Sequence, residues 1–456
     1  MVRYETRFKE MMAQAELSPD TVRGLLDRLE TFVLPFCVGL SQPGMQRHAA
    51  QYMTGLLSDL GHKTAEGIAY LLDHDRQPLQ RFIGQADWDH RPPLMTLAQQ
   101  VGSTLGQADG VIVFDPSAFA KKGKKSVGVA RQWCGRLGKV ENCQIGVYMG
   151  YVSGAGHILV NFRLYLHEEW AKDKARRNEA GVPREVTSQT RHELALEMLS
   201  ECGLHLPHGW IAGDDEMGRP GHFRQDLRDL GERYLLAVPS NTRVRDQDAP
   251  LPEYSGRGRY PKNPFRRVDV LCKALLEEAW TRIEVRDGEK GPLVVEAVKR
   301  RVRARNETGG EGPDELLFIT RELQSDGTYK LDYALSNAGA DVPLNELARV
   351  AKAEHRIEEC LERAKGEAGL ADYQVRNWPG WHRHQTLSLL AAWFLNEETR
   401  RGKNRDPRAD IAATSAVDRG ADRGLARRQR VDQAVPPQHA LAAPQRTGTV
   451  LSPSFT

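Results

Sequence analysis

A series of short apolar runs between residues 108 and 240 constrains the fold of this chain more than any other feature. The first runs, with a turn of small residues at 153–156 that is typical of a hairpin, are followed by alternating helical and strand-like segments as far as residue 238. Strands that alternate with helices after an opening meander favour a mixed α/β sheet with helices on its faces. The opening runs lie at 110–117, 144–152 and 157–166.

The regions on either side of this segment have different patterns. Residues 1–95 carry apolar residues at three-to-four spacing, which predicts a helical domain. Strand-like runs predict a β-rich insertion over 241–345, and a helical pattern returns over 346–395. From residue 396 the periodicity is lost and Pro, Gly, Arg and Ala predominate, so we predict a disordered tail over 396–456. The mixed sheet then occupies 96–240.

Composition narrows the classes of function. The 456 residues hold 64 Lys and Arg against 61 Asp and Glu, a net charge of +3, and the eleven Lys or Arg and five Asp of residues 400–456 contribute +6 of it. The rest of the chain therefore sums to −3, and net charge indicates no partner. The longest apolar run, 387–395, is too short to cross a membrane, and the N-terminus has no hydrophobic signal region. Six scattered cysteines without C-x-x-C spacing argue against zinc ribbons and disulfides, so we expect a cytoplasmic protein.

Acidic residues follow two of the strand-like runs. Asp115 ends the first run, and Asp214 and Asp215 end the run that begins at Trp210. The ends of neighbouring strands can bring such carboxylates together. Taken alone, however, an Asp before Pro or after Gly is more often a turn residue.

A third acid lies on a late helical segment, 353–366. Glu358 is at the edge of its apolar stripe, and Lys365, seven residues further on, shares the same face. A solvated Glu/Lys face is the alternative interpretation of that helix. Three carboxylates would suit Mg²⁺, and two such ions would suit cleavage of a phosphodiester.

Long blocks of sequence surround these acids. They are DPSAFAKKGKKSVGVARQWCGRLGKVENCQIGVYMGY, WIAGDDEMGR and HRIEECLERAKGEAGLADYQVRNWPGWHRHQTLSLLAAWFL. In order and extent they resemble the DDE-superfamily endonucleases found as bacterial insertion-sequence transposases, most closely the insertion sequence 701 type. The resemblance covers roughly residues 20–395 and leaves out the tail.

The resemblance implies an α/β fold with a ribonuclease-H-like catalytic core, a β-rich insertion, an N-terminal helical domain that binds DNA, and a disordered C-terminal tail. It implies that Asp115, Asp214 and Glu358 are the catalytic residues and the ligands of two Mg²⁺ (or Mn²⁺) ions. Lys365 matches the lysine of the family's glutamate signature. The chain departs from that signature at Ala351, where a tyrosine is usual, and at Glu354, where an arginine is usual.

Several basic residues are candidate DNA contacts. The lysines that follow Asp115 lie beside the predicted metal site, and alternating arginines share one face of a strand-like run near residue 302. A solvated loop and a solvated strand face are the alternatives. The DNA-binding candidates are Lys121, Lys122, Lys124, Lys125, Arg301, Arg303, Lys365 and Arg383.

The function implied by the resemblance is DNA transposition. The chain would cleave and join strands at the terminal repeats of an insertion sequence and in double-stranded target DNA, as a homo-oligomer, in the bacterial cytoplasm in association with the nucleoid and without membrane contact. Glu354 and Ala351 motivate an alternative, a decayed or repurposed transposase that binds DNA without cleaving it. A ribonuclease or a resolvase on the same fold is a further alternative.

Overall fold

The computed structural model describes residues 24–37, 39–40, 42–286 and 293–405. Residues 24–398 of this set lie in one compact unit, and of a second unit only residues 399–405 are described, as the end of a long helix. No helix in the described ranges combines the length and the hydropathy needed to cross a bilayer. All six cysteines are buried free thiols.

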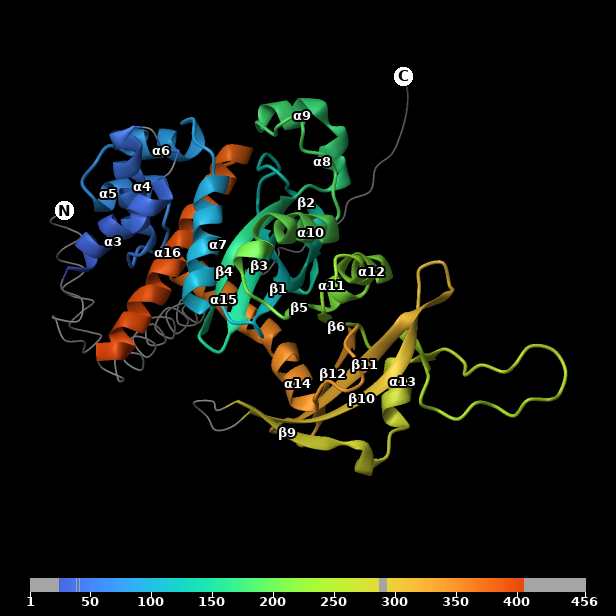
Figure 1. The fold of residues 1–456 in the computed structure, drawn as a ribbon. Helices are drawn as coiled ribbons and strands as arrows, with labels where there is room; N and C mark the ends of the chain where they lie inside the picture. The colour runs from blue at the N-terminus through green and yellow to red at the C-terminus, as the bar shows by residue number, and fades with distance from the viewer. Residues whose placement is uncertain (1–23, 38, 41, 287–292, 406–456) are drawn as a thin grey trace, which may run out of the picture. The chain divides into compact units, whose positions relative to one another are not determined.

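Helices occupy most of the described chain before the first strand (Figure 1). Local capping fixes two of their starts, because the Thr64 side chain accepts a hydrogen bond from the Gly67 amide and Asp75 accepts one from the Gln77 amide. Pro92 and Pro93 lie in the first turn of helix α7, where proline is tolerated. The helices are α3 (Leu25–Val33), α4 (Pro43–Leu56), α5 (Ala65–Leu71), α6 (Arg76–Gly84) and α7 (Arg91–Leu105), with a 3₁₀ turn at Leu34–Cys37.

A mixed sheet begins at residue 111. Strand β1 pairs antiparallel with β3, β3 forms a hairpin with β4, and β1, β5 and β6 run parallel to one another. The predicted strands and hairpin of this segment are confirmed, and the short strand β2 was not predicted. The strands are β1 (Val111–Ala120), β2 (Ala130–Cys134), β3 (Lys139–Ser153), β4 (Gly156–Tyr165), β5 (Trp210–Gly213) and β6 (Tyr234–Ala237). The helices of the segment are α8 (Glu168–Lys172), α9 (Lys174–Glu179), α10 (Arg191–Cys202), α11 (Asp215–Gly218) and α12 (Gly221–Asp229).

Strand β1 does not end where the sequence predicted. It continues through Pro116 to Ala120, so the expectation that Asp115 closes this strand is wrong. Its pairing with β5 stops at Phe114, while its pairing with β3 runs the full length. Beyond Phe114 one edge of β1 therefore has no strand partner among the described residues, and a proline without an amide hydrogen is tolerated there.

The residues of the predicted insertion extend the same sheet. Strand β12 pairs with β6, and the twelve strands of the described chain include the order β2-β3-β1-β5-β6-β12-β11-β10-β7-β8. This mixed α/β architecture with one large sheet is consistent with a ribonuclease-H-like nuclease. The added elements are β7 (Arg243–Asp246), β8 (Arg266–Arg267), α13 (Val268–Lys273), β9 (Thr281–Arg286), β10 (Leu293–Arg305), β11 (Glu311–Leu323) and β12 (Tyr329–Ser336).

Three helices follow the last strand: α14 (Leu344–Ala351), α15 (Ala353–Gly366) and α16 (Trp378–Arg405). Helix α15 packs on β1, β3, β4 and β5. The contact with β3 is close, because a side chain at Gly150 would overlap Ile357. Helix α16 runs past Asn396, so the predicted tail does not start at 396, and residues 406–456 lie outside the described chain.

Candidate active site

Asp115 and Asp214 are brought together by the parallel pairing of β1 and β5. Phe114 is opposite Gly213 in this pairing, and each aspartate is the next residue of its chain. Asp214 then caps helix α11, since its Oδ1 accepts a hydrogen bond from the Met217 amide at 2.9 Å. Two carboxylates that lie far apart in the sequence are therefore held side by side, one within β1 and one directly after β5.

The electrostatics of this pair are unusual for aspartate. Burial, followed by the charges of Asp214 and Glu358, raises the pKa of Asp115 to about 8, and the ammonium of Lys365 opposes this rise. Burial likewise raises the pKa of Asp214 to about 6, against the hydrogen bond from Met217. Buried like charges of this kind are costly unless a cation neutralises them, and they are common at functional sites.

Helix α15 presents one face to these aspartates. Glu354, Glu358 and Lys365 recur on that face at spacings of four and seven residues. The Lys365 ammonium donates a hydrogen bond to the Ser117 hydroxyl at 2.8 Å, and Ser117 follows Asp115 by two residues on the same face of β1. The strand and the helix are thus joined directly beside Asp115.

Glu358 interacts electrostatically with the two aspartates, but its side chain points to His355. Its carboxylate contributes to the raised pKa values of both, yet its side chain is 57% exposed and its Oε2 lies 3.2 Å from Nδ1 of His355. In the described ranges no three Asp, Glu, His or Cys side chains lie close enough together to share one metal ion. The donor chemistry of the two buried aspartates fits a hard divalent cation such as Mg²⁺, and a third ligand from Glu358 would require its side chain to leave His355.

Glu354 adds a further negative charge to this field. Burial, then Asp214, Asp115 and Glu358, raise its pKa well above the ordinary carboxyl value. Arg356 and Arg383 lie within thirty residues of Glu354 in the sequence and are candidates to replace the missing signature arginine, but both are engaged elsewhere. Arg356 pairs with Glu359 at 2.9 Å, and Arg383 is buried against the Trp88 carbonyl oxygen.

Arg191 is a cation at this site that the sequence analysis did not identify. It is the first residue of α10, it forms an ion pair with Glu216, and its guanidinium lies 4.9 Å from the centre of the Tyr165 ring. Its charge lowers the pKa of Asp214, whereas burial raises it. The signal in the sequence was the Thr190-x-x-Glu193 capping box. This motif predicts where the helix starts, but it does not predict which groups the side chain of its first residue contacts.

Lys63 is a second residue that the sequence analysis missed. It lies between α4 and α5 with only 4% of its surface exposed, and its ammonium donates hydrogen bonds to the carbonyl oxygens of Gly366 and Glu367. A cation at this position stabilises the C-terminal end of α15. The N-terminal helical segment therefore holds the end of the helix that carries Glu358 and Lys365.

The four lysines after Asp115 fall into different environments. The Lys121 ammonium lies 3.5 Å from the centre of the Tyr373 ring, and burial lowers its pKa to about 8. Lys125 is exposed and pairs with Glu179 at 3.4 Å. Lys122 and Lys124 are exposed side chains of the β1–β2 connection.

The other predicted DNA contacts are engaged within the protein. Arg301 pairs with Asp248 at 2.7 Å, and Arg303 pairs with Asp314 at 2.6 Å. Arg383 is 6% exposed and donates to backbone oxygens, so we no longer count it among the DNA contacts. Its neighbours His382 and His384 are also buried, and they too are core residues rather than contacts.

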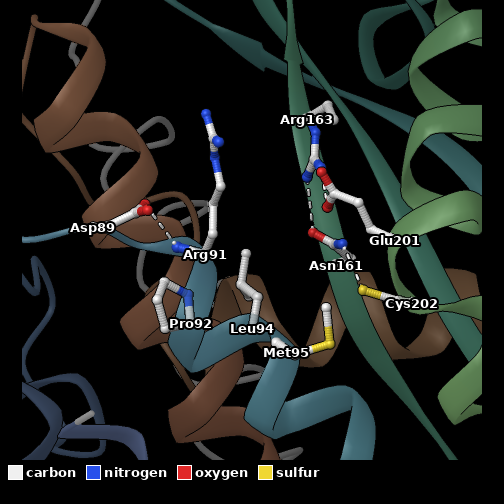
Figure 2. Close-up of a pocket in the computed structure, with 9 residues that line it drawn as sticks. All are labelled: Asp89, Arg91, Pro92, Leu94, Met95, Asn161, Arg163, Glu201 and Cys202. Carbon is white, nitrogen blue, oxygen red and sulfur yellow. Dashed lines mark hydrogen bonds and ion pairs between the residues drawn. The ribbon is translucent and has the colours of Figure 1, made fainter. Parts of the chain in front are cut away.

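A cavity of about 270 Å³ lies away from these acids, between the start of α7, strand β4 and the end of α10 (Figure 2). Arg163, on its wall, is neutralised by Glu197 and Glu201, and Asn161 donates a hydrogen bond to the Cys202 thiol. None of the predicted site residues lines it. The lining consists of Asp89, Arg91, Pro92, Leu94, Met95, Asn161, Arg163, Glu201 and Cys202.

Comparison with known proteins agrees with the resemblance. A family model described as DDE superfamily endonuclease matches residues 35–292, more than half of the chain, a range that includes Asp115 and Asp214 and ends before Glu358. The protein of Microchaete diplosiphon named "Probable transposase for insertion sequence element IS701" is 27% identical over 193 residues, which cover 41% of this chain and 47% of that relative. The chain thus spans about half the length of this relative. It belongs to the family of DDE superfamily endonucleases.

Proposed function

We propose that the chain is a DNA transposase that cleaves and joins the strands of an insertion sequence, with Asp115, Asp214 and Glu358 as its catalytic residues. The observation that carries the proposal is the neighbouring position of Asp115 and Asp214 on β1 and β5, with the raised pKa of both carboxyl groups. The family and the name of the relative indicate the substrate. The proposal includes a ribonuclease-H-like core, terminal repeats and target DNA as partners, a homo-oligomer on DNA, and a cytoplasmic, nucleoid-associated location.

Asp115 and Asp214 would hold the two Mg²⁺ (or Mn²⁺) ions, with Glu358 as a further ligand once its carboxylate has left His355. Bound there, the metal would supply Lewis-acid chemistry at the phosphodiester. Both aspartates must lose their protons to act as ligands, and because the pKa of Asp115 is raised to about 8, a cation that compensates the charge would favour this deprotonation near neutral pH.

The cations around the acids have separate roles in this proposal. Lys365, hydrogen-bonded to Ser117 beside Asp115, would orient the helix and approach a phosphate oxygen. Arg191, near Asp214 and fixed by Glu216, would take the place of the arginine that Glu354 replaces. Lys121, Lys122, Lys124 and Lys125 would contact the DNA backbone next to the site.

The role of Arg191 is tested by Arg191→Met and Arg191→Lys. We expect the methionine variant to lower kcat for strand cleavage by about tenfold to a hundredfold with little change in DNA binding, because one phosphate-directed cation is lost. The lysine variant should recover part of the rate. The matched control is Arg219→Met, since Arg219 is exposed and pairs only weakly with Asp215. Equal cleavage rates for the wild type and all variants would show that Arg191 has no role in the proposed site.

A specific observation supports the alternative of a transposase that binds DNA without cleaving it. Glu354 adds charge to the carboxylate field, and its own pKa is raised well above the ordinary value. A further acid near a scissile phosphate repels that phosphate, whereas an arginine would attract it. Under this alternative, Glu354→Arg would restore cleavage.

The proposed function is tested by cleavage of an end-labelled duplex that carries the element's own terminal repeat. Wild type and Asp115→Ala would be compared with Mg²⁺ and with EDTA, and DNA binding would be measured in parallel. We expect metal-dependent nicking at the repeat end by the wild type alone, with binding retained by the variant. Nicking by Asp115→Ala at the wild-type rate would contradict the assignment, and binding without nicking by both proteins would favour the decayed transposase. Preferred cleavage of an RNA–DNA hybrid or of branched DNA would favour the ribonuclease or the resolvase.

A further inference from the structure

The connection between β7 and β8 forms a long exposed loop. Residues 251–260 are all solvent-exposed, and Figure 1 shows the segment, in yellow-green, extending away from the sheet. Its base is well anchored. The buried Asn263 amide donates hydrogen bonds at 3.0 Å to the carbonyl oxygens of Asp246 and Ala249, and Lys262 pairs with Glu311 of β11 at 2.8 Å. The loop is therefore fixed to the sheet at one end and open to solvent along its length.

The cations at the tip of this loop differ from those of the neighbouring strands. Arg257 and Arg259 are exposed, and neither guanidinium group forms a hydrogen bond or an ion pair within the described chain, although the Arg257 carbonyl oxygen accepts a hydrogen bond from the Ser255 hydroxyl. Arg301 and Arg303 of β10, by contrast, are held by Asp248 and Asp314. In the described chain, the loop tip thus carries two exposed guanidinium groups without a carboxylate partner, in contrast to Arg301 and Arg303.

Two aromatic side chains lie at the same tip. Tyr254 and Tyr260 stack with their ring centres 4.6 Å apart at an angle of 23°, and Tyr260 is 79% exposed. The turn between them is ordered, since the Tyr254 hydroxyl donates to the Gly258 carbonyl oxygen and Gly256 has a φ of 77°, a conformation that favours glycine. The exposed rings are therefore presented by a defined turn beside the free guanidinium groups.

We propose that this loop, residues 251–262, is a contact surface for the backbone of duplex DNA. Arg257 and Arg259 pair with phosphates, and the stacked Tyr254 and Tyr260 pack against the sugars at the edge of a groove. Exposed arginines without carboxylate partners complement phosphates, and tyrosines commonly make contacts to the DNA backbone. The inference rests on the proposed function, because that function makes DNA the substrate.

The test compares two double variants of the full chain. Fluorescence anisotropy would follow binding of a labelled duplex of arbitrary sequence at several salt concentrations for Arg257→Ala/Arg259→Ala and for the control Arg267→Ala/Lys330→Ala. We expect the loop variant to lose roughly fivefold in affinity for each phosphate contact at about 0.15 M salt, and its salt slope to fall by about 0.9 per contact. The control should bind like the wild type, since Arg267 pairs with Asp269 and Lys330 pairs with Asp332.

Tyr254→Ala/Tyr260→Ala provides an independent arm, for which we expect about a fivefold loss or more at an unchanged salt slope. The exposed loop carries no core residue, so the thermal midpoint of both loop variants should equal that of the wild type. Unchanged DNA affinity and salt slope in both loop variants would overturn the proposal, as would a loop-dependent affinity for anionic phospholipid vesicles with none for DNA. Failure of the loop proposal is distinguishable from failure of the proposed function. In the first case wild type and loop variants bind and cleave DNA alike, whereas in the second the wild type does not cleave DNA.

Discussion

The two halves of the sheet differ in which charged side chains lie next to one another. In the half built by β3, β1, β5 and β6, buried carboxylates lie next to one another and the pKa values of Asp115 and Asp214 are raised. In the half built by β12, β11, β10 and β7, carboxylates lie next to cations, and the hydrogen bond from Arg303 lowers the pKa of Asp314. Both halves belong to one sheet, so the difference is not a consequence of the architecture.

The contrast separates charges that serve folding from charges that serve chemistry. A paired surface charge such as Arg301–Asp248 costs little and contributes little to stability. Adjacent buried carboxylates cost the fold free energy, and their position is explained by a metal cation that they would bind. The paired half would support DNA, and the unpaired half would act on it.

The largest expected effect separates the halves by function. Asp214→Asn should lower metal-dependent strand cleavage on the order of 10³-fold or more, because it removes one oxygen ligand of the proposed metal site. Asp314→Asn, the same substitution in the paired half, should leave cleavage near the wild-type rate. Single-turnover cleavage of the labelled duplex measures both. A comparable loss of cleavage rate in the two variants would show that the two halves of the sheet do not differ in function.

The next effect concerns the junction of the halves. Arg224 of α12 pairs with Glu315 of β11 at 2.8 Å, with side chains 7% and 1% exposed, and the Tyr234 hydroxyl also donates to Glu315. Arg224→Met should lower the free energy of unfolding by about 3–5 kcal/mol, because Glu315 would remain buried without its partner. Urea denaturation of this variant and of Arg224→Met/Glu315→Leu measures the effect. The double variant should recover much of the loss, and a loss below about 1 kcal/mol in the single variant would show that the junction does not depend on this pair.

The raised pKa of Asp115 predicts a pH dependence of stability. The folded protein, whose Asp115 has a pKa of about 8, holds the proton more tightly than the unfolded chain does, whose carboxyl keeps its ordinary value of 3.8. The resulting stabilisation is complete below about pH 4 and is lost as the pH rises to about 8. Asp115→Asn should therefore be more stable than the wild type at about pH 8 in EDTA, on the order of 1 kcal/mol or more.

Urea denaturation at about pH 5 and about pH 8 measures this difference. The gain of Asp115→Asn over the wild type should be larger at the higher pH. Asp314→Asn is the matched control, because the pKa of Asp314 is lowered and its substitution should bring no gain. If the free energies of unfolding of wild type and Asp115→Asn changed with pH in parallel, the raised pKa of the buried Asp115 carboxyl would be contradicted.

The smallest effect is expected for a charge of the paired half. Arg301→Ala should change the free energy of unfolding by about 0–1 kcal/mol, because its side chain is 63% exposed and salt screens the pair with Asp248. Thermal denaturation at low and at high salt measures it. A loss above about 2 kcal/mol would mean that the paired half depends on its ion pairs for folding.

Local patterns predicted the strands around the site. Apolar runs with a small-residue turn located β1, β3 and β4, whereas the acids after two runs were only candidates until the family resemblance singled out Asp115 and Asp214. Long-range pairing was not predictable in this way. The extension of the sheet by β12 depends on a pairing with β6 across about a hundred residues of chain, which leaves no periodic signal in the sequence.

The direction in which side chains point could not be predicted from the sequence either. Arg383 looked like a DNA contact from its basic neighbours, yet the face of α16 that carries it is buried against Trp88. Lys63 contacts a carbonyl oxygen 303 residues away in the sequence, and Arg191 pairs with an acid about two dozen residues away. Each contact is made by a single charged group. A lone cation that reaches a distant helix end or acid leaves no motif, so only the folded chain reveals it.

The central claim is that the unpaired carboxylates on β1 and β5 form the divalent-metal site. Its most direct test is Mn²⁺ binding, followed by electron paramagnetic resonance, to wild type, Asp115→Asn, Asp214→Asn and the control Asp248→Asn, whose carboxylate is held by Arg301. We predict that both core variants lose the tightest Mn²⁺ site and that Asp248→Asn keeps it. Equal Mn²⁺ binding by all four proteins would contradict the claim.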